Sequence, residues 1–219
     1  FERGPDGSFR LRHVNHAYNT EINDILLTAL AMSIRQWARL PRIMINLEGH
    51  GRESIFPDGN IDINRAVGWF TTQYPVALEL PSSSGVSENI RTVKETLRKI
   101  PQKGIGYGIL QYLTSGEING GLPLEFQPQI SFNYLGQFGE NNGGESTSVS
   151  IANTGETVGP EMENHFVLNI NGMVSGGKLR LTFGYNHLEY DAASIDALTL
   201  HYETCLLEII HHCENRKNT

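Results

Sequence analysis

The chain has 219 residues, of which 39% are hydrophobic and 19% are charged, and its formal net charge is −7. This balance is typical of a globular protein with a buried core, and the lack of a long basic run argues against nucleic-acid binding. The negative charge also disfavours attachment to an anionic membrane surface, and no apolar segment approaches the roughly 20 residues that a membrane-spanning helix needs.

The first predicted element is a helix from about Glu21 to Arg39, where apolar residues repeat at helical spacing. Thr20 is its expected N-cap, and Pro41 marks its end. A short apolar strand from Ile43 to Leu47 should follow, and it leads directly into a polar hexapeptide that begins at Glu48.

The middle of the chain mixes extended and helical signals. Val67 to Leu80 is apolar and predicted to be extended, with a break at Pro75. Ser87 is the expected cap of a second helix from Glu88 to Lys99, and Ile105 to Leu113 predicts a further short helix.

The second half of the chain predicts three strands and a long helix. Ile130 to Tyr134 is the first strand, and Phe166 to Asn171 and Lys178 to Tyr185 form an alternating pair joined by a hairpin-like turn. The last element is a helix from about Ala192 to Glu214, with Asp191 as its cap.

A polar segment from Gly139 to His165 contains no Lys or Arg and is rich in Gly, Asn, Ser, Thr and Glu. Segments of this length are typically functional or disordered loops, so we expect a flexible loop or arm at about 139–165. Because helices and strands mix along the chain without an internal repeat, we predict an α/β fold in which a mixed β-sheet packs with helices.

The two cysteines, Cys205 and Cys213, lie eight residues apart on one predicted helix. That separation is too long for a disulfide, so both are expected to be buried, reduced thiols. A reducing cytoplasm fits them best. The polar start of the chain has no apolar core of a secretory signal, which agrees with a cytoplasmic location.

The hexapeptide at Glu48 combines two carboxylates, an imidazole and a guanidinium. Gly49 and Gly51 remove side-chain bulk on both sides of His50, which permits close approach of a backbone or ligand. Burial would raise the pKa of a carboxyl group here and Arg52 would lower it, an opposition that can tune a general base. From the residues alone, a polar loop with a structural Glu–Arg pair is the simpler interpretation, since ion-pair networks gather the same residues.

A second candidate lies at the end of the strand that begins at Ile130. Asn133 and Tyr134 are neighbours, so in a strand they point to opposite faces, and Gly136 permits a bend nearby. Tyr134 can donate a hydrogen bond to a carbonyl group or relay a proton. A core tyrosine with a satisfied hydroxyl is an equally good interpretation.

Other signals are weak. The glycines between Gly104 and Gly108 lack the spacing of a dinucleotide-binding loop. The adjacent pair His211 and His212 points about 100° apart around a helix, which is unsuited to joint metal binding, and we predict no metal site. No serine-hydrolase nucleophile elbow occurs.

Taken together, several motifs resemble the epimerization domains of nonribosomal peptide synthetases, which belong to the condensation superfamily. Four motifs appear in the order in which they occur in this family. One stretch near the start of the chain also resembles the family's sequences. The four are Glu48–Glu53, Arg65–Pro75, Pro101–Gly108 and Phe132–Gln137, and the stretch is Ala17–Ala29.

The resemblance implies a chloramphenicol-acetyltransferase-like fold of two lobes, with residues 1–219 forming the C-terminal lobe. The family's first lobe carries a His-His-x-x-x-Asp-Gly motif, which is absent from these residues because the position of Asp after His211–His212 is Arg216. We therefore expect this chain to supply half of the active site and to be inactive alone.

The implied reaction converts the L to the D configuration at the α-carbon of an aminoacyl or peptidyl thioester, as in the biosynthesis of peptide antibiotics. The substrate would hang on the 4′-phosphopantetheine arm of a peptidyl carrier protein, with no cofactor bound by the chain itself. The implied partners are therefore that carrier protein and the N-terminal lobe of the same domain.

By resemblance, Glu48 is the acid/base carboxylate that abstracts or returns the α-proton. Further residues of the same motifs are predicted to complete the site. They are Tyr134, Asn133 and Arg52 as catalytic residues, and His50, Trp69 and Phe70 as substrate-binding residues.

Three alternatives remain open. The chain can be the lobe of a condensation domain that forms peptide bonds, although the motifs at Glu48 and Phe132 favour epimerization. It can be a noncatalytic docking module for a carrier protein. A stand-alone relative of the acyltransferases would need a histidine motif from elsewhere.

Overall fold

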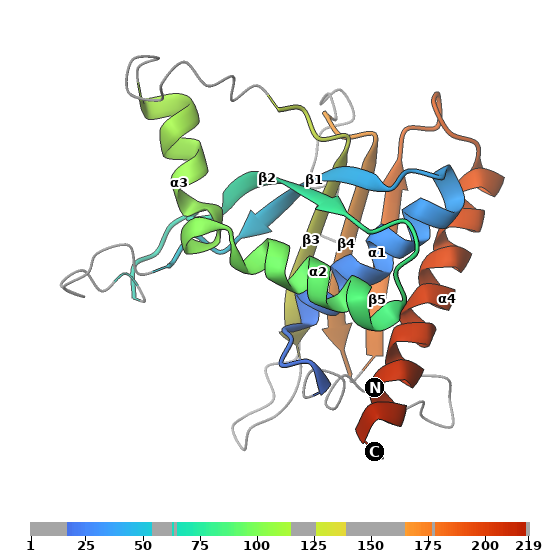
Figure 1. Cartoon of the computed structure of the whole chain (residues 1–219). Helices are drawn as coiled ribbons and strands as arrows, with labels where there is room; N and C mark the ends of the chain where they lie inside the picture. Colours follow the sequence, from blue (N-terminus) through green and yellow to red (C-terminus); the bar gives the residue numbers. More distant parts are fainter. Residues whose placement is uncertain are drawn as a thin grey trace.

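The computed structural model describes residues 17–53, 63, 65–114, 126–138, 165–176 and 178–217. Its centre is a five-stranded sheet in the order β2-β1-β3-β4-β5 (Figure 1). The strands are β1 (Arg42–Gly49), β2 (Thr72–Glu79), β3 (Ile130–Phe138), β4 (Leu168–Ser175) and β5 (Lys178–Tyr185). The helices are α1 (Ile22–Ala38), α2 (Val86–Arg98), α3 (Ile105–Gly108) and α4 (Ala192–Lys217), with short helical turns η2 (Pro101–Gly104) and η3 (Ile109–Leu113).

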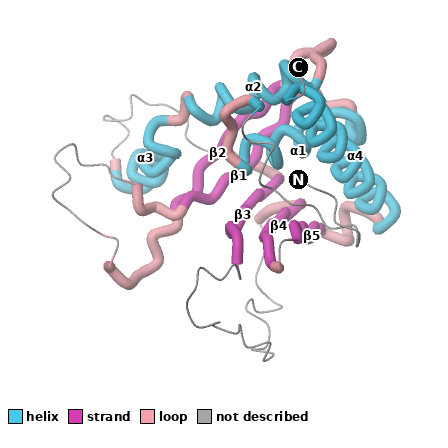
Figure 2. Tube along the Cα trace, turned by 90° about the horizontal axis from the view of Figure 1, so that it is seen from below, coloured by secondary structure: helices cyan, strands magenta, loops and turns pink. Residues whose placement is uncertain are grey.

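The sheet is mixed, as the sequence predicts. β1 pairs with β3, and β3 with β4, in parallel, whereas β2 and β5 run antiparallel to their neighbours at the two edges. Helices α1, α2 and α4 lie on one side of the sheet (Figure 2). The α/β fold predicted from the sequence is therefore confirmed.

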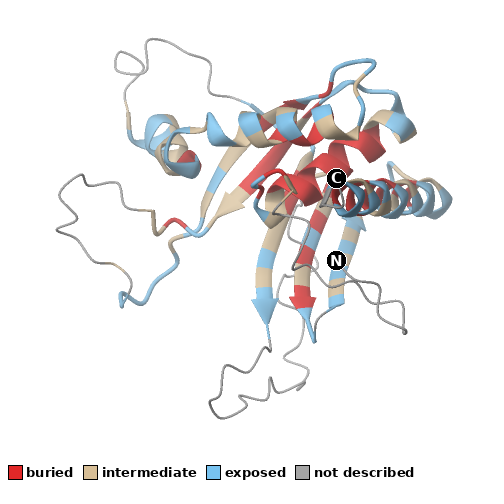
Figure 3. Ribbon diagram, turned by 60° about the horizontal axis from the view of Figure 1, so that its bottom comes forward, coloured by how far each residue is buried: buried red, intermediate tan, exposed pale blue. Residues whose placement is uncertain are grey.

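The core lies between this helical layer and the sheet. Ile43, Ile45 and Leu47 alternate along β1 and are buried, so they point towards the helices. In α1 the eleven consecutive residues from Asp24 to Ile34 are buried, because α1 packs against α2 and α4 as well as the sheet. Figure 3 shows the buried residues concentrated where α1 meets the strands.

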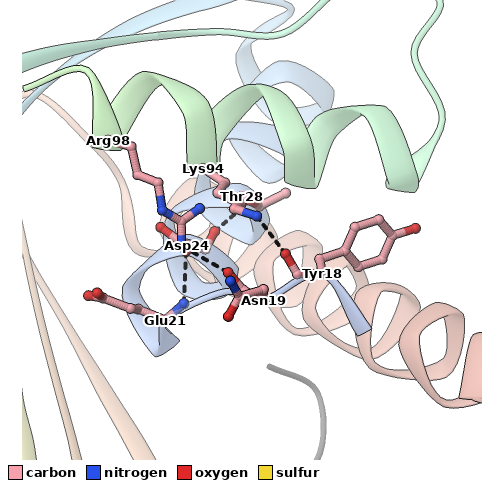
Figure 4. Close-up of polar contacts among 7 residues, drawn as sticks. All are labelled: Tyr18, Asn19, Glu21, Asp24, Thr28, Lys94 and Arg98. Atoms are coloured by element: carbon pink, nitrogen blue, oxygen red, sulfur yellow. Dashed lines mark hydrogen bonds and ion pairs between the residues drawn. The ribbon is translucent and has the colours of Figure 1, made fainter. Parts of the chain in front are cut away.

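The start of α1 is fixed by α2 (Figure 4). Lys94 Nζ donates to the carbonyl oxygen of Tyr18 at 2.6 Å, and Arg98 Nη2 donates to that of Asn19 at 2.8 Å. The N-cap of α1 is Glu21, whose backbone N–H donates to Asp24 Oδ2 at 2.8 Å in a reciprocal capping box. The predicted cap at Thr20 is thus wrong by one residue.

Two strands extend beyond their predicted ends. β1 continues to Gly49, so Glu48 lies inside the strand, opposite a residue of β2, rather than starting a loop. β3 continues to Phe138 through an irregularity between Tyr134 and Gln137, where Gly136 has φ 94°. Glycine tolerates this left-handed backbone because it has no Cβ, and the predicted bend at Gly136 is confirmed.

Other boundaries also shift. Pro75 lies inside β2 instead of breaking it, because a sheet tolerates proline in an edge strand. The N-cap of α2 is Gly85 rather than Ser87. β4 continues to Ser175 and β5 begins at Lys178, so the turn between them is shorter than predicted. The expected cap of α4 is confirmed, since the backbone N–H of Ser194 donates to Asp191 Oδ1 at 2.7 Å.

Both cysteines are buried, as predicted, and no disulfide joins them within the described part of the chain. None of the helices in the described ranges is long and apolar enough to cross a membrane. Most of the predicted loop at 139–165 lies outside the described residues.

Candidate active site

Glu48 is the central residue of a polar row that crosses three neighbouring strands. Gln73 lies directly opposite it on β2, and Asn133 lies beside it on β3. Gln73 Nε2 donates to Glu48 Oε1 at 3.2 Å, and Asn133 Nδ2 donates to Glu48 Oε2 at 2.7 Å. Each carboxylate oxygen is therefore held by one neutral amide, which fixes the orientation of the group.

The row faces away from the helical layer. Ile45 and Leu47 point into the core, so strand alternation places Asn46 and Glu48 on the opposite face. A cavity of about 1040 Å³ opens on that face, and Asn46, Gln73 and Pro75 form part of its wall. Because Gln73 both lines the cavity and contacts Glu48, the carboxylate lies next to this space.

Six aromatic side chains form part of the remaining cavity wall. They come from the segment before β2, from α3 and η3, and from the segments that precede β3 and β4. These residues are Trp69, Phe70, Tyr107, Tyr112, Phe126 and Phe166. Within the described part of the chain the wall contains no Lys, Arg, Asp or Glu, and His165 is its one basic side chain, so the cavity suits a largely uncharged ligand group.

Arg52 has a structural role that the sequence did not reveal. Its guanidinium donates to the carbonyl oxygens of Ile63 and Ala66, the latter at 3.0 Å, and its Cζ lies 4.3 Å from the centre of the Phe70 ring. No ion pair joins it to Glu48 among the residues described. Arg52 thus fixes the segment that carries Phe70 against the end of β1.

His50 belongs to a separate polar group at the end of β1. Its Nε2 lies 2.9 Å from Glu53 Oε1, and Lys103 Nζ lies 3.7 Å from the same oxygen. The backbone N–H of Arg52 donates to His50 Nδ1 at 3.0 Å. The His50 side chain is 62% exposed, and its predicted role in substrate binding stays a prediction.

The predicted close approach at the glycines is confirmed at Gly51. Its φ is 64°, and a Cβ there would lie 1.5 Å from the carbonyl oxygen of Phe70. Gly104, in the third motif, has φ 80°, and a Cβ there would lie 2.2 Å from the Tyr74 ring. These two glycines allow the segments around the Glu48 row to pack closely, so their function is structural.

Tyr134 lies on the other side of the sheet. It packs against the core, and its ring faces the backbone of Gly172, where a Cβ would lie 3.3 Å from Tyr134 Cδ2. Burial raises the pKa of its hydroxyl above the ordinary value of 10.0. The prediction that Asn133 and Tyr134 point to opposite faces is confirmed, and the structure does not bring Tyr134 to Glu48.

Of the predicted site residues, the structure brings Asn133 to Glu48 and places Trp69 and Phe70 in the wall of the neighbouring cavity. Trp69 is 91% exposed. Sequence reasoning missed Gln73, although it lies in the second motif. The register between β1 and β2 identifies it, and that register is not readable from the sequence.

The described residues contain no group of three His, Cys, Asp or Glu side chains that could hold a metal ion. The groups that the described structure offers to a ligand here include a carboxylate, the amides around it, and the aromatic rings, the threonine hydroxyls and the His165 imidazole of the cavity wall.

Comparison with known proteins gives consistent matches. A family model described as Condensation domain matches residues 5–219. Gramicidin S synthase 1 of Brevibacillus brevis is 48% identical over 95% of this chain, and tyrocidine synthase 2 of Brevibacillus parabrevis is 45% identical over 93%. The chain spans only 20% and 6% of the lengths of these two relatives.

Solved structures agree. The crystal structure of the epimerization domain from the third module of tyrocidine synthetase B is 46% identical and superimposes with a TM-score of 0.83 over 93% of this chain and 44% of that chain. The condensation domain from the Monacolin K polyketide synthase is 16% identical, with a TM-score of 0.63 over 94% of this chain and 45% of that chain. The latter similarity concerns the fold alone.

Proposed function

Because the chain belongs to the condensation-domain family of nonribosomal peptide synthetases, we propose that it is the C-terminal lobe of an epimerization domain and that Glu48 transfers the α-proton of the substrate. The observation that carries this proposal is the carboxylate held by Gln73 and Asn133 beside a large cavity whose described wall has no Lys, Arg, Asp or Glu. The likeness to an epimerization domain at 46% identity supports it.

The proposed substrate is an aminoacyl or peptidyl thioester on the phosphopantetheine arm of a carrier protein. Glu48 takes the α-proton as the C–H bond breaks, and the electron pair moves towards the thioester carbonyl to give an enolate. A group on the opposite face then delivers a proton to the α-carbon, which inverts its configuration. Proton exchange with solvent then returns Glu48 and the second group to their starting protonation states.

Proton abstraction from carbon needs a base at a fixed distance and angle. Glu48 satisfies this need because it lies inside β1 and its two oxygens are held from β2 and β3. The second acid/base group is proposed to come from the His-His-x-x-x-Asp-Gly motif of an N-terminal lobe, since residues 1–219 do not contain that motif.

The test is loss of the substrate α-proton to deuterated solvent, measured by mass spectrometry on the complete two-lobe domain with its loaded carrier. Glu48→Gln is expected to lower the exchange rate by at least about 10²-fold, the usual contribution of a positioned base. The glutamine side chain also carries N–H groups at a position where the Glu48 carboxylate accepts hydrogen bonds from Gln73 and Asn133. Undiminished exchange in this variant would falsify the assignment.

Glu79→Gln is the matched control. Glu79 is exposed at the far end of β2, roughly 20 Å along the strand from Gln73, so the same substitution there should leave exchange unchanged. In a parallel reaction, the 219-residue chain without a first lobe is expected to give no exchange.

The alternative function is peptide-bond formation, which the match to the family model described as Condensation domain favours. The same loaded carrier, offered with an acceptor aminoacyl carrier, separates the two activities. Peptide formation without α-proton exchange would identify a condensation domain. Carrier binding with neither reaction, once the first lobe is present, would identify a docking module.

A further inference from the structure

Asn46 has a buried amide with an unused donor next to the proposed base. It lies two residues before Glu48 on β1 and on the same face of the sheet. Its side chain is 7% exposed and lines the cavity beside Glu48. Within the described structure, its Nδ2 has no hydrogen-bond partner.

An unpaired buried amide is unusual. Nearly all buried polar groups in folded proteins have a hydrogen-bond partner, and one without a partner destabilises the fold. On β2 Asn46 faces Pro75, whose side chain has no polar atom, and on β3 it lies opposite the buried Ser131. Among the described residues neither Ser131 nor the amides of Gln73 and Asn133, which hold Glu48, forms a hydrogen bond with Asn46 Nδ2.

The position of this donor matches a requirement of the proposed reaction. Negative charge moves from the α-carbon to the thioester oxygen as Glu48 takes the proton, and a fixed N–H donor lowers the barrier when it lies at that oxygen. Residues two apart on one strand face are roughly 7 Å apart. This spacing accommodates the α-carbon and the carbonyl group of the thioester between Glu48 and Asn46.

We propose that Asn46 is a catalytic residue whose Nδ2 donates a hydrogen bond to the thioester carbonyl oxygen and to the enolate oxygen that forms from it. The inference rests on the proposed function. No proton moves from Asn46 in this step, because the α-proton goes to Glu48 and the developing charge stays on the substrate oxygen.

The test compares Asn46→Val and Asn46→Thr in the complete domain with its loaded carrier. The two side chains have the same shape, but only threonine keeps a donor. The valine variant is expected to lower kcat for α-proton exchange by about 10²–10³-fold, with KM unchanged because the bond strengthens in the transition state. The kcat of the threonine variant should be at least about tenfold higher than that of the valine variant.

The second measurement is the stability of the Asn46→Val variant. Most substitutions of buried residues lower the stability, but this one is expected not to. If Nδ2 is unused in the free protein, Asn46→Val should unfold at an equal or higher denaturant concentration than the wild type while it loses activity. Asn46→Leu is a second variant without a donor, should valine fold poorly. The control is Asn89→Ala, which removes another buried amide with an unpartnered Nδ2, on α2 and away from the cavity, and should keep the wild-type exchange rate.

The outcomes separate the two proposals. Wild-type exchange in both donor-free variants would overturn the role of Asn46 and leave that of Glu48 intact. A rise in KM with unchanged kcat would also overturn it, because Asn46 would then only shape the cavity wall. A wild-type domain without any exchange would contradict the proposed function itself.

Discussion

Gln73 is the residue through which β2 contributes to the site. Its amide holds Glu48 Oε1 while Asn133 holds Oε2, so its loss should let the carboxylate rotate. A net hydrogen bond of about 1 kcal/mol corresponds to roughly a fivefold change in rate. In the complete two-lobe domain with its loaded carrier, we expect Gln73→Leu to lower kcat for α-proton exchange by about that factor or more.

The unfolding midpoint of Gln73→Leu should stay close to the wild type, because Gln73 is exposed and lies on an edge strand. Gln137→Leu, which alters an exposed glutamine on β3, is the matched control. An unchanged kcat would show that Asn133 alone fixes Glu48.

At this scale the sequence predicts part of the site and misses part of it. Glu48 and Asn133 are predicted because the motifs that contain them resemble those of epimerization domains. Gln73 is not, since its partner depends on the register between two strands. Nor is Asn46, because no sequence pattern tells which buried amide lacks a partner. The predicted pairing of Glu48 with Arg52 is not found among the described residues, where Arg52 binds backbone carbonyls instead.

At the scale of elements, the junction of α1 and α2 contains a buried carboxyl group with a distinct pH dependence. Asp24 is 5% exposed. Its burial raises the pKa above the ordinary value of 3.8, and the hydrogen bond from Glu21 and the nearby Arg98 oppose this shift only in part. Folding therefore favours the protonated form of Asp24.

A carboxyl group whose pKa rises on folding contributes stability at low pH that is lost as the pH increases through the folded value. The substitution Asp24→Asn keeps an acceptor for the Glu21 N–H without any charge. We expect the free energy of unfolding of this variant, relative to wild type, to increase from pH 3 to about pH 6. Denaturant titrations at several pH values measure this difference, and a constant difference would contradict the assignment.

The same scale shows what the sequence predicts well. Every helix and strand expected within the described residues is present, because periodicity of apolar residues marks which elements exist. Their ends are less predictable. Glu48 and Gly49 extend β1 because β2 supplies partners for them, and Gly85 caps α2 although Ser87 has the better side chain.

At the scale of the whole molecule, the two thiols on α4 report on global unfolding. Cys205 is 0% exposed, and burial raises its pKa to about 11, so it is both shielded and protonated at neutral pH. Cys213 is also buried. Since only the thiolate reacts, alkylation of the native protein at about pH 8 should be very slow.

Iodoacetamide labelling followed by mass spectrometry checks this expectation. Both cysteines should be modified within minutes in denaturant and remain unmodified in native buffer over the same time. Rapid labelling of Cys205 in native buffer would show that α4 separates from α1 without global unfolding.

The proline in β2 has a consequence for the molecule in solution. β2 is an edge of the sheet, and exposed edges are where strands of different molecules join and aggregate. Pro75, near the middle of β2, offers no N–H to an incoming strand. Pro75 therefore makes β2 a less regular template for pairing with a strand of another molecule.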